Sequence, residues 1–195
     1  IGREALAKAG LTVDDAQFIS QGTAGRLAGL VAGQIDGVSL HPEDAMLAMK
    51  QKPGLHILAQ VVDLVPNYMF NGYGASTDLI AKDPALIRDL TASMIEANRT
   101  IYREKDKVLP IITAATQKPP EAVAYAWEQL TKSCIWSVNT GFDRARTQWT
   151  IDNDVMHGDI DAAKKPSVDD VIDEKLAAEA VAAVGGPVTI GGCKD

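Results

Sequence analysis

Residues 10–37 read GLTVDDAQFISQGTAGRLAGLVAGQIDG, and this stretch decides the predicted fold. Residues 17–20 are a short strand candidate, and residues 24–35 place apolar side chains at the three- and four-residue spacing of an amphipathic helix. Residues 37–40 are a second apolar strand candidate, and Pro42 suits the start of the next helix, where a missing N–H is harmless. Helix and strand therefore alternate over short connections, which is typical of a parallel sheet covered by helices.

Local signals extend this pattern to the rest of the chain. Residues 3–9 are strong helix formers ended by Gly10, and residues 55–65 are a longer strand-like run. After Pro66, residues 68–74 are a strand candidate and the remainder is mostly helical. The later helices are predicted after Asp83-Pro84, after Pro119-Pro120, along Phe142, Ala145 and Trp149, and from Asp173 through Val184. We therefore predict an α/β lobe over 1–65, a hinge strand and helical body over 66–186, and a loose tail over 187–195.

Composition restricts the classes of partner. The 195 residues are 46% hydrophobic and carry a formal net charge of -7, with no cluster of lysine and arginine. Nucleic acid is therefore not an expected partner, because phosphate backbones are bound by concentrated basic surfaces. No stretch approaches the roughly 20 uncharged apolar residues that cross a bilayer, and residues 1–20 lack the features of a signal peptide. We expect a folded protein without direct membrane insertion, whose export signal is removed or outside this sequence.

The cysteines and histidines give no metal-binding pattern. Cys134 lies in an apolar helical stretch and Cys193 in the predicted tail, and neither belongs to a CxxC or Cys/His spacing. We predict a buried thiol and a tail thiol, with a disulfide between them as the alternative in an oxidising compartment. No Ser/His/Asp, Cys/His or paired-carboxylate constellation is present, so no catalytic residue, metal or cofactor is predicted.

Residues 10–37 resemble the second lobe of the sulfonate/nitrate/taurine-type (NMT1/THI5-like) solute-binding proteins of ABC importers. In that family a Gly-Leu turn and an acidic pair precede a strand, an arginine-bearing helix follows a glycine, and a Gly-x-Ile-Asp step leads to the next strand. Residues 82–87 (KDPALI) resemble the family's proline-bearing helix start, and residues 166–180 (PSVDDVIDEKLAAEA) resemble its closing helix. In this sense the resemblance covers residues 1–186, and it rests on the order of the motifs.

The resemblance implies the type II periplasmic-binding-protein fold, an α/β class with a small parallel-sheet lobe and a mostly helical, partial second lobe. In the family, a first lobe of several strands precedes the helix at residues 3–9, and nothing here supplies it. The N-terminal third is therefore expected to be cleaved or outside this sequence. An apolar surface that it would cover is then expected to be exposed or paired with another copy of the chain.

Candidate ligand-binding residues follow the predicted strands, because ligands of open α/β sheets lie beyond the carboxyl ends of the strands. After the first strand come Gln21, Gly22 and Thr23, where glycine allows a close backbone approach and a hydroxyl lies beside free helix N–H groups. After the second come His41 and Glu43, at another helix start. The alternatives are structural: Thr23 as a helix N-cap, and Glu43 as a side chain that favours the helix dipole.

Asn67 and Tyr68 are two further candidates, in the predicted hinge. Tyr68 is the better of the two, because its aromatic ring can cover a ring of the ligand while its hydroxyl hydrogen-bonds the edge of that ring. The alternative is a structural role as a half-buried tyrosine of a strand. Arg26 offers a forked anion-binding group but lies a turn inside its helix, where a solvent-facing or salt-bridging role is equally compatible. The three tryptophans are predicted to pack in the core: Trp127, Trp136 and Trp149.

The resemblance implies an extracytoplasmic protein, periplasmic or lipid-anchored, that is not an enzyme. Its two lobes would close on a small polar organic molecule or anion and deliver it to an ABC permease. Sulfonates, nitrate, taurine and a pyrimidine vitamin precursor are the ligands that the family suggests. Two alternatives stay open. One is an enzyme like the family's thiamine-pyrimidine synthases, whose cysteine-rich motif is absent here. The other is the ligand-sensing domain of a LysR-type regulator, although no basic recognition helix is present.

Overall fold

The chain divides into two compact units. The computed structural model describes residues 1–69 and 71–194, apart from the side chains of residues 23 and 24. Unit 1 comprises Ile1–Pro66 and Leu109–Ser133, and unit 2 comprises Asn67–Val108 and Cys134–Asp195. The chain therefore passes from one unit to the other three times. Each unit is described by itself below.

The fold is helical, and the predicted α/β class with a parallel-sheet lobe is wrong. The chain is 58% helical and 1% strand, and its described residues form no sheet. The only extended pairings among the described residues are two isolated bridges, Pro53 with Leu55 and Ile190 with Cys193. Apolar and β-branched residues favour an extended backbone, but a strand exists only through a ladder with a neighbour. The stretches predicted as strands at 17–20 and 37–40 have no such neighbour, and neither do the described residues of 68–74, from which residue 70 is excluded. Part of the run at 55–65 is the short helix α4 (Val61–Leu64).

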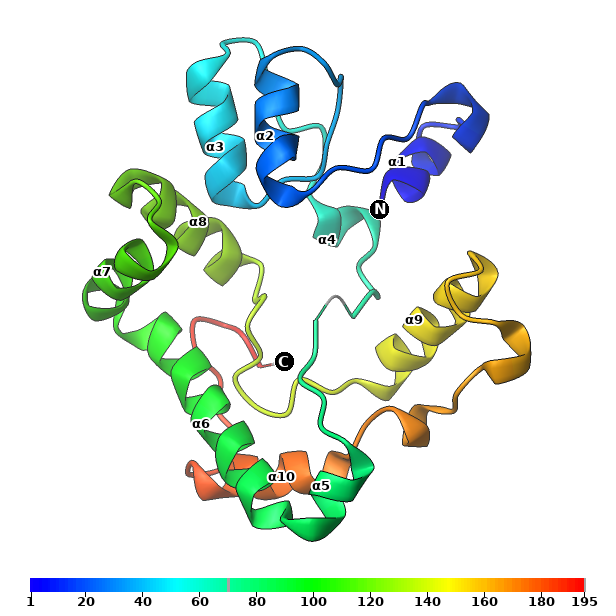
Figure 1. Cartoon of the computed structure of the whole chain (residues 1–195). Helices are drawn as coiled ribbons and strands as arrows, with labels where there is room; N and C mark the ends of the chain where they lie inside the picture. Colours follow the sequence, from blue (N-terminus) through cyan, green and yellow to red (C-terminus); the bar gives the residue numbers. More distant parts are fainter. Residues whose placement is uncertain (70, 195) are drawn as a thin grey trace. The chain divides into compact units, whose positions relative to one another are not determined.

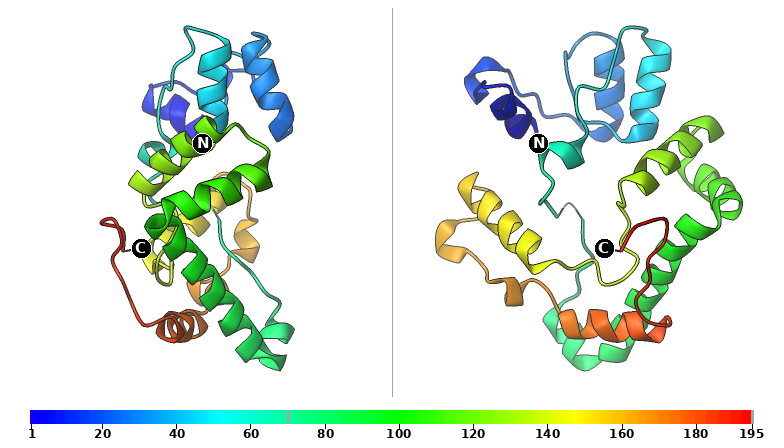
Figure 2. Two further views of the ribbon diagram at one scale, coloured as in Figure 1. Left: turned by 90° about the vertical axis from the view of Figure 1, so that its left-hand side faces the viewer. Right: turned by 180° about the vertical axis from the view of Figure 1, so that it is seen from behind.

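Unit 1 is built on the packing of α3 (Pro42–Gln51) against α2 (Thr23–Val31) and α8 (Pro120–Lys132). Figures 1 and 2 show α2 and α3 side by side. The buried side chains of α3 and α8 are small, which allows the helices to approach closely: Ala48, Ala122, Val123 and Ala126. Its other helices are α1 (Gly2–Lys8), the 3-10 turn η1 (Val13–Asp15), α4, and most of α7 (Lys105–Thr116), which begins in unit 2.

An ion pair reinforces the contact between α3 and the start of α8. The Asp44 carboxylate, on α3, accepts a hydrogen bond from Lys118 Nζ, and its side chain is only 9% exposed. A second pair, Lys50 with Glu121 at 3.2 Å, is largely exposed. The Asp44–Lys118 pair therefore contributes more to the stability of unit 1 than the exposed one does.

Unit 2 is centred on the packing of α6 (Pro84–Arg103) against α10 (Glu174–Ala183). Ala92 and Ile95 of α6 form a buried cluster with Ala180 and Val181 of α10. Figures 1 and 2 show these two helices crossing in contact. The unit also contains α5 (Thr77–Lys82), α9 (Arg144–Met156), and the 3-10 turns η2 (Ala162–Lys164) and η3 (Val168–Asp170).

Aspartate caps begin three helices of unit 2. The carboxylates of Asp83, Asp143 and Asp173 each accept a hydrogen bond at 3.0 Å from the backbone N–H three residues later. These bonds satisfy donors that the first helical turn leaves unpaired. The predicted caps at Asp83 and Asp173 are therefore confirmed, as is the predicted helix start at Pro120.

Arg99 of α6 joins three parts of unit 2. Its side chain is buried, with 1% of its surface exposed. The guanidinium donates to the carbonyls of Val138 at 2.8 Å, Val184 at 2.7 Å and Gly186 at 2.8 Å. Val184 and Gly186 follow the last turn of α10, where carbonyls lack helical partners. Arg99 therefore satisfies the end of α10 and ties it to the loop that contains Val138.

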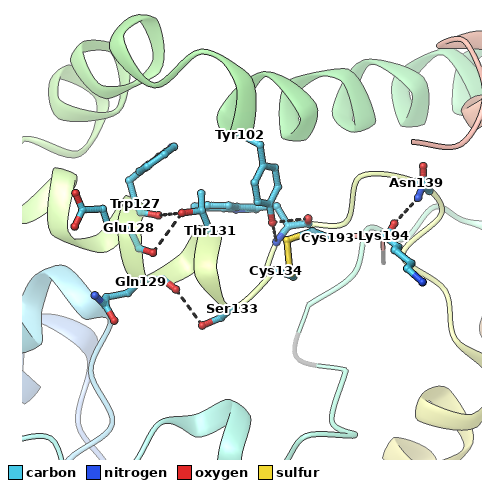
Figure 3. The surroundings of a disulfide bond; sticks show 11 residues. Tyr102, Trp127, Glu128, Gln129, Thr131, Ser133, Cys134, Asn139, Cys193 and Lys194 are labelled. Carbon is cyan, nitrogen blue, oxygen red and sulfur yellow. Dashed lines mark hydrogen bonds between the residues drawn. A yellow bond between two sulfur atoms is a disulfide. The ribbon is translucent and has the colours of Figure 1, made fainter. Parts of the chain in front are cut away.

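A disulfide joins Cys134 to Cys193, with an S–S distance of 2.05 Å, so the predicted pair of free thiols is wrong. Figure 3 shows the bond between the chain that follows α8 and the segment near residue 193. Beside it, the Tyr102 hydroxyl donates to the Trp136 carbonyl at 2.9 Å, and the two rings meet edge to face. The sequence offered this bond only as the alternative, because the two cysteines lie 59 positions apart and only the fold brings them together.

Unit 1 exposes several large apolar side chains. Phe18, Ile19 and Leu58 are 58%, 54% and 84% exposed, and all three lie in stretches outside helices. Exposed apolar groups of this size favour association with another surface. Among the described residues, none of the helices combines the length and apolar character that crossing a membrane requires.

Candidate functional site

The predicted site residues fall into two groups, one in each unit. Gln21, Gly22, Thr23, His41 and Glu43 belong to unit 1, whereas Asn67 and Tyr68 belong to unit 2. Within unit 1, the structure brings its group to one end of the α2–α3 pair. Figure 1 shows that both helices run in the same direction, so their first turns lie at the same end. The Thr23 side chain lies outside the described residues.

The start of α2 is organised by Gln21 and Arg26. Gly22 is the N-cap, with an extended backbone at φ -65 and ψ 160. The Arg26 Nε–H donates to the Gln21 carbonyl at 3.2 Å, which gives this arginine a structural contact at the helix start. The Gln21 side chain lies along the helix, since a Cβ added at Gly29 would come within 3.2 Å of its Oε1. Glycine at position 29 therefore makes room for the Gln21 amide, whose Oε1 is buried without a hydrogen-bond partner.

His41 and Glu43 occupy the start of α3. His41 is the N-cap residue and is exposed, without a side-chain capping bond, and Glu43 is half-buried in the first turn. Pro42 occupies the first helical position, as predicted. A carboxylate in the first turn favours the helix dipole, so the structural alternative for Glu43 remains consistent with its position.

Tyr68 packs against α9 in unit 2. Its ring meets the Trp149 ring edge to face, with centroids 6.4 Å apart and an interplanar angle of 89°. Burial raises the pKa of Tyr68 above its ordinary value, and the nearby carboxylates of Asp154 and Asp159 raise it further. The neutral phenol therefore serves as a hydrogen-bond donor. Asn67 is exposed, and its carbonyl lies 3.5 Å from the Thr150 hydroxyl.

One face of α9 carries the groups that surround Tyr68. The Met69 N–H donates to Thr150 Oγ1 at 2.9 Å, and Arg146 Nη2 donates to the Tyr68 carbonyl at 3.4 Å. Arg146 Nε and Asn153 Oδ1 are both buried without a hydrogen-bond partner. Residues 146, 150 and 153 are spaced by four and three along the helix, so they lie on one face. The segment 67–69 therefore crosses a face that bears an unpaired donor and an unpaired acceptor.

The sequence predicted a ligand-binding role for Tyr68 but did not place Arg146, Trp149 or Asn153 beside it. Trp149 was assigned to the core, and it is half-buried against Tyr68. The available signal was the spacing of polar residues along the helix that follows Asp143, which places an arginine, a threonine and an asparagine on one face. Nothing in the sequence near Tyr68 connects it to a helix about 80 residues later.

The Tyr68 group combines several kinds of side chain that can bind a polar molecule. An aromatic pair, a guanidinium, a carboxamide and a carboxylate can hold a polar molecule by hydrogen bonds and ring contact. Within residues 1–69 and 71–194, no cluster of His, Cys, Asp and Glu side chains is arranged to hold a metal ion.

No protein-family model, no curated protein and no solved structure matches this chain.

Proposed function

We propose that the chain belongs to an extracytoplasmic solute-binding protein, which captures a small polar organic molecule or anion for an ABC permease. The observation that carries this proposal is the group around Tyr68. Buried polar atoms without partners are rare in native proteins, and each costs about 1–3 kcal/mol. Arg146 Nε and Asn153 Oδ1 are two such atoms on the α9 face that the segment 67–69 covers.

A ligand that enters this face beside Tyr68 would offer partners to both atoms. Arg146 Nε–H requires an acceptor, such as a carboxylate or sulfonate oxygen, and Asn153 Oδ1 requires an N–H or O–H donor. The Tyr68 and Trp149 rings would then contact the ligand's apolar or planar part. A small molecule that carries both an anionic and a donor group fits this requirement.

Two further features support the extracytoplasmic assignment and the binding mode. The Cys134–Cys193 disulfide is typical of proteins in oxidising compartments, such as the periplasm. The division into two compact units meets a requirement of binding proteins that close by hinge motion.

Thermal-shift measurements on the oxidised chain test the proposal. The panel contains taurine, alkyl sulfonates, nitrate, amino acids and pyrimidines. At a ligand concentration 100 times Kd, binding stabilises the protein by about 2.7 kcal/mol, which raises the Tm by several degrees. Tyr68→Ala is expected to abolish the shift. Tyr73→Ala is the matched control, because Tyr73 is 81% exposed in the same segment. Equal ligand shifts in both variants would exclude Tyr68 from the site.

A further inference from the structure

The segment that contains Cys193 forms a tight turn. Ile190 and Cys193 exchange two backbone hydrogen bonds, at 3.0 and 2.9 Å. The two residues between them, Gly191 and Gly192, have φ values of 59 and 87. Consecutive positive φ values define the hairpin turn in which glycine is strongly favoured. The Gly-Gly pair therefore sets the turn from which Cys193 reaches Cys134.

Two anchors hold residues 187–194 on unit 2. One is the Asn139 side chain, whose Oδ1 accepts from Val188 N–H at 2.8 Å and whose Nδ2 donates to the Val188 carbonyl at 3.1 Å. The same Nδ2 donates to the Lys194 carbonyl, as Figure 3 shows. The other anchor is the disulfide, which fixes the buried Cys193 to Cys134. One amide side chain thus binds the segment at Val188 and Lys194, and one covalent bond fixes it at Cys193.

The chain before this segment is held differently. Arg99 binds the carbonyls of Val184 and Gly186, and these contacts involve no cysteine. Loss of the disulfide therefore leaves the end of α10 in place. Beyond Gly186, the entropy of ordering eight residues exceeds what the hydrogen bonds of Asn139 contribute net of water. The covalent bond is the contact that keeps the segment folded back.

We propose that the Cys134–Cys193 disulfide is a redox latch, whose reduction releases residues 187–194 while Arg99 keeps the preceding helix end in place. Oxidising conditions close the latch and reducing conditions open it. Cys134 has a φ of 50, a left-handed backbone conformation that is unfavourable for a residue other than glycine. Opening the disulfide removes a restraint that helps to hold this conformation. The latch does not depend on the proposed function.

The more exposed cysteine is the one that a reductant reaches first. Cys134 is half-buried, whereas Cys193 is 3% exposed. A thiolate of a dithiol reductant attacks Cys134 Sγ, the S–S bond breaks, and Cys193 leaves as a thiolate that takes up a proton. The second thiol of the reductant then attacks the mixed disulfide and releases the Cys134 thiol. Two electrons and two protons pass from the dithiol to the protein, and the reductant becomes a disulfide.

Hydrogen exchange followed by mass spectrometry tests the latch on the full chain, oxidised and after reduction with dithiothreitol. Reduction is expected to speed amide exchange in residues 188–194 at least tenfold, with residues 180–186 and α6 unchanged. Reoxidation should restore the original rates. Unchanged exchange in residues 188–194 would overturn the latch. Loss of protection throughout unit 2 would also overturn it, because the disulfide would then hold the whole unit and not one segment.

Two further measurements sharpen the test. The double variant Cys134→Ser with Cys193→Ser is expected to exchange like the reduced protein and to be insensitive to dithiothreitol. If this variant fails to fold, the reduction of the unmodified chain remains decisive. Brief treatment with glutathione, acid quenching and peptide mapping should find the mixed disulfide on Cys134. A mixed disulfide confined to Cys193 would contradict the proposed order of attack.

Discussion

Replacement of Arg99 by methionine tests what holds unit 2 together. Methionine preserves much of the length and apolar character of the side chain but removes every donor. Three carbonyls then lose their partner: Val138, Val184 and Gly186. Because Arg99 is 1% exposed, water cannot replace these bonds without a local rearrangement.

The expected loss of stability is worked from those three bonds. A buried carbonyl left without a partner costs about 1–3 kcal/mol, which gives roughly 3–9 kcal/mol for three if nothing relaxes. Removing a buried guanidinium also relieves its desolvation, which offsets part of this loss. We therefore expect the free energy of unfolding to fall by about 3–5 kcal/mol. For a unit of about 100 residues, this lowers the Tm by roughly 12 °C or more.

Urea denaturation of Arg99→Met, followed by near-UV circular dichroism and tryptophan fluorescence, measures this loss. Arg103→Met is the matched control on the same helix, because Arg103 is 46% exposed and its ion pair with Glu96 is long, at 3.9 Å. The control should change the free energy of unfolding by less than about 1 kcal/mol. If Arg99→Met were as mild as Arg103→Met, the three carbonyl bonds would not stabilise unit 2 as argued.

Three other predictions follow from single contacts. Asp44→Ala should lower the free energy of unfolding by about 3 kcal/mol, because it leaves the partly buried Lys118 unpaired. Lys50→Ala breaks an exposed pair and should change the free energy of unfolding by less than about 1 kcal/mol. Equal effects in urea denaturation would contradict this ranking. Burial raises the pKa of Tyr102 above its ordinary value of 10.0, so the stability from its neutral phenol is complete below about pH 10 and is lost as the pH rises through the folded value. Tyr102→Phe should flatten this alkaline fall in the free energy of unfolding. If the slope against pH were the same in the variant, Tyr102 would not be its cause. Phe18→Ser combined with Leu58→Ser should reduce concentration-dependent self-association in analytical ultracentrifugation; association that persists undiminished would show that these exposed side chains do not drive it.

Helix starts were predictable because their signals are local. Asp83 and Asp173 each bind a backbone N–H three residues away, and Pro42 and Pro120 occupy first helical positions. Such contacts depend only on neighbouring residues, so sequence alone indicates them. The helix α5, within 77–82, was not predicted, although Ser76 caps it in the same way.

The predicted strands failed because a strand depends on a partner elsewhere in the chain. Phe18 and Ile19 have the composition of a strand, yet no described segment pairs with them. The same limit applies to the candidate site. Tyr68 was predicted as a candidate from its chemistry, but its contacts with Arg146 and Trp149 span about 80 residues and are set by the fold. The disulfide is a third example, because the sequence offered the Cys134–Cys193 bond only as an alternative and did not show that the fold brings the two cysteines together.

The proposal that this chain carries a small polar solute is tested most directly by native mass spectrometry of the oxidised protein, purified without added ligand. We expect a fraction of the unmodified protein to retain one molecule that bears an acidic group and a hydrogen-bond donor. Tyr73→Ala should retain it and Tyr68→Ala should lose it. A protein that carries no small molecule, and binds none when incubated with the ligand panel, would contradict the account.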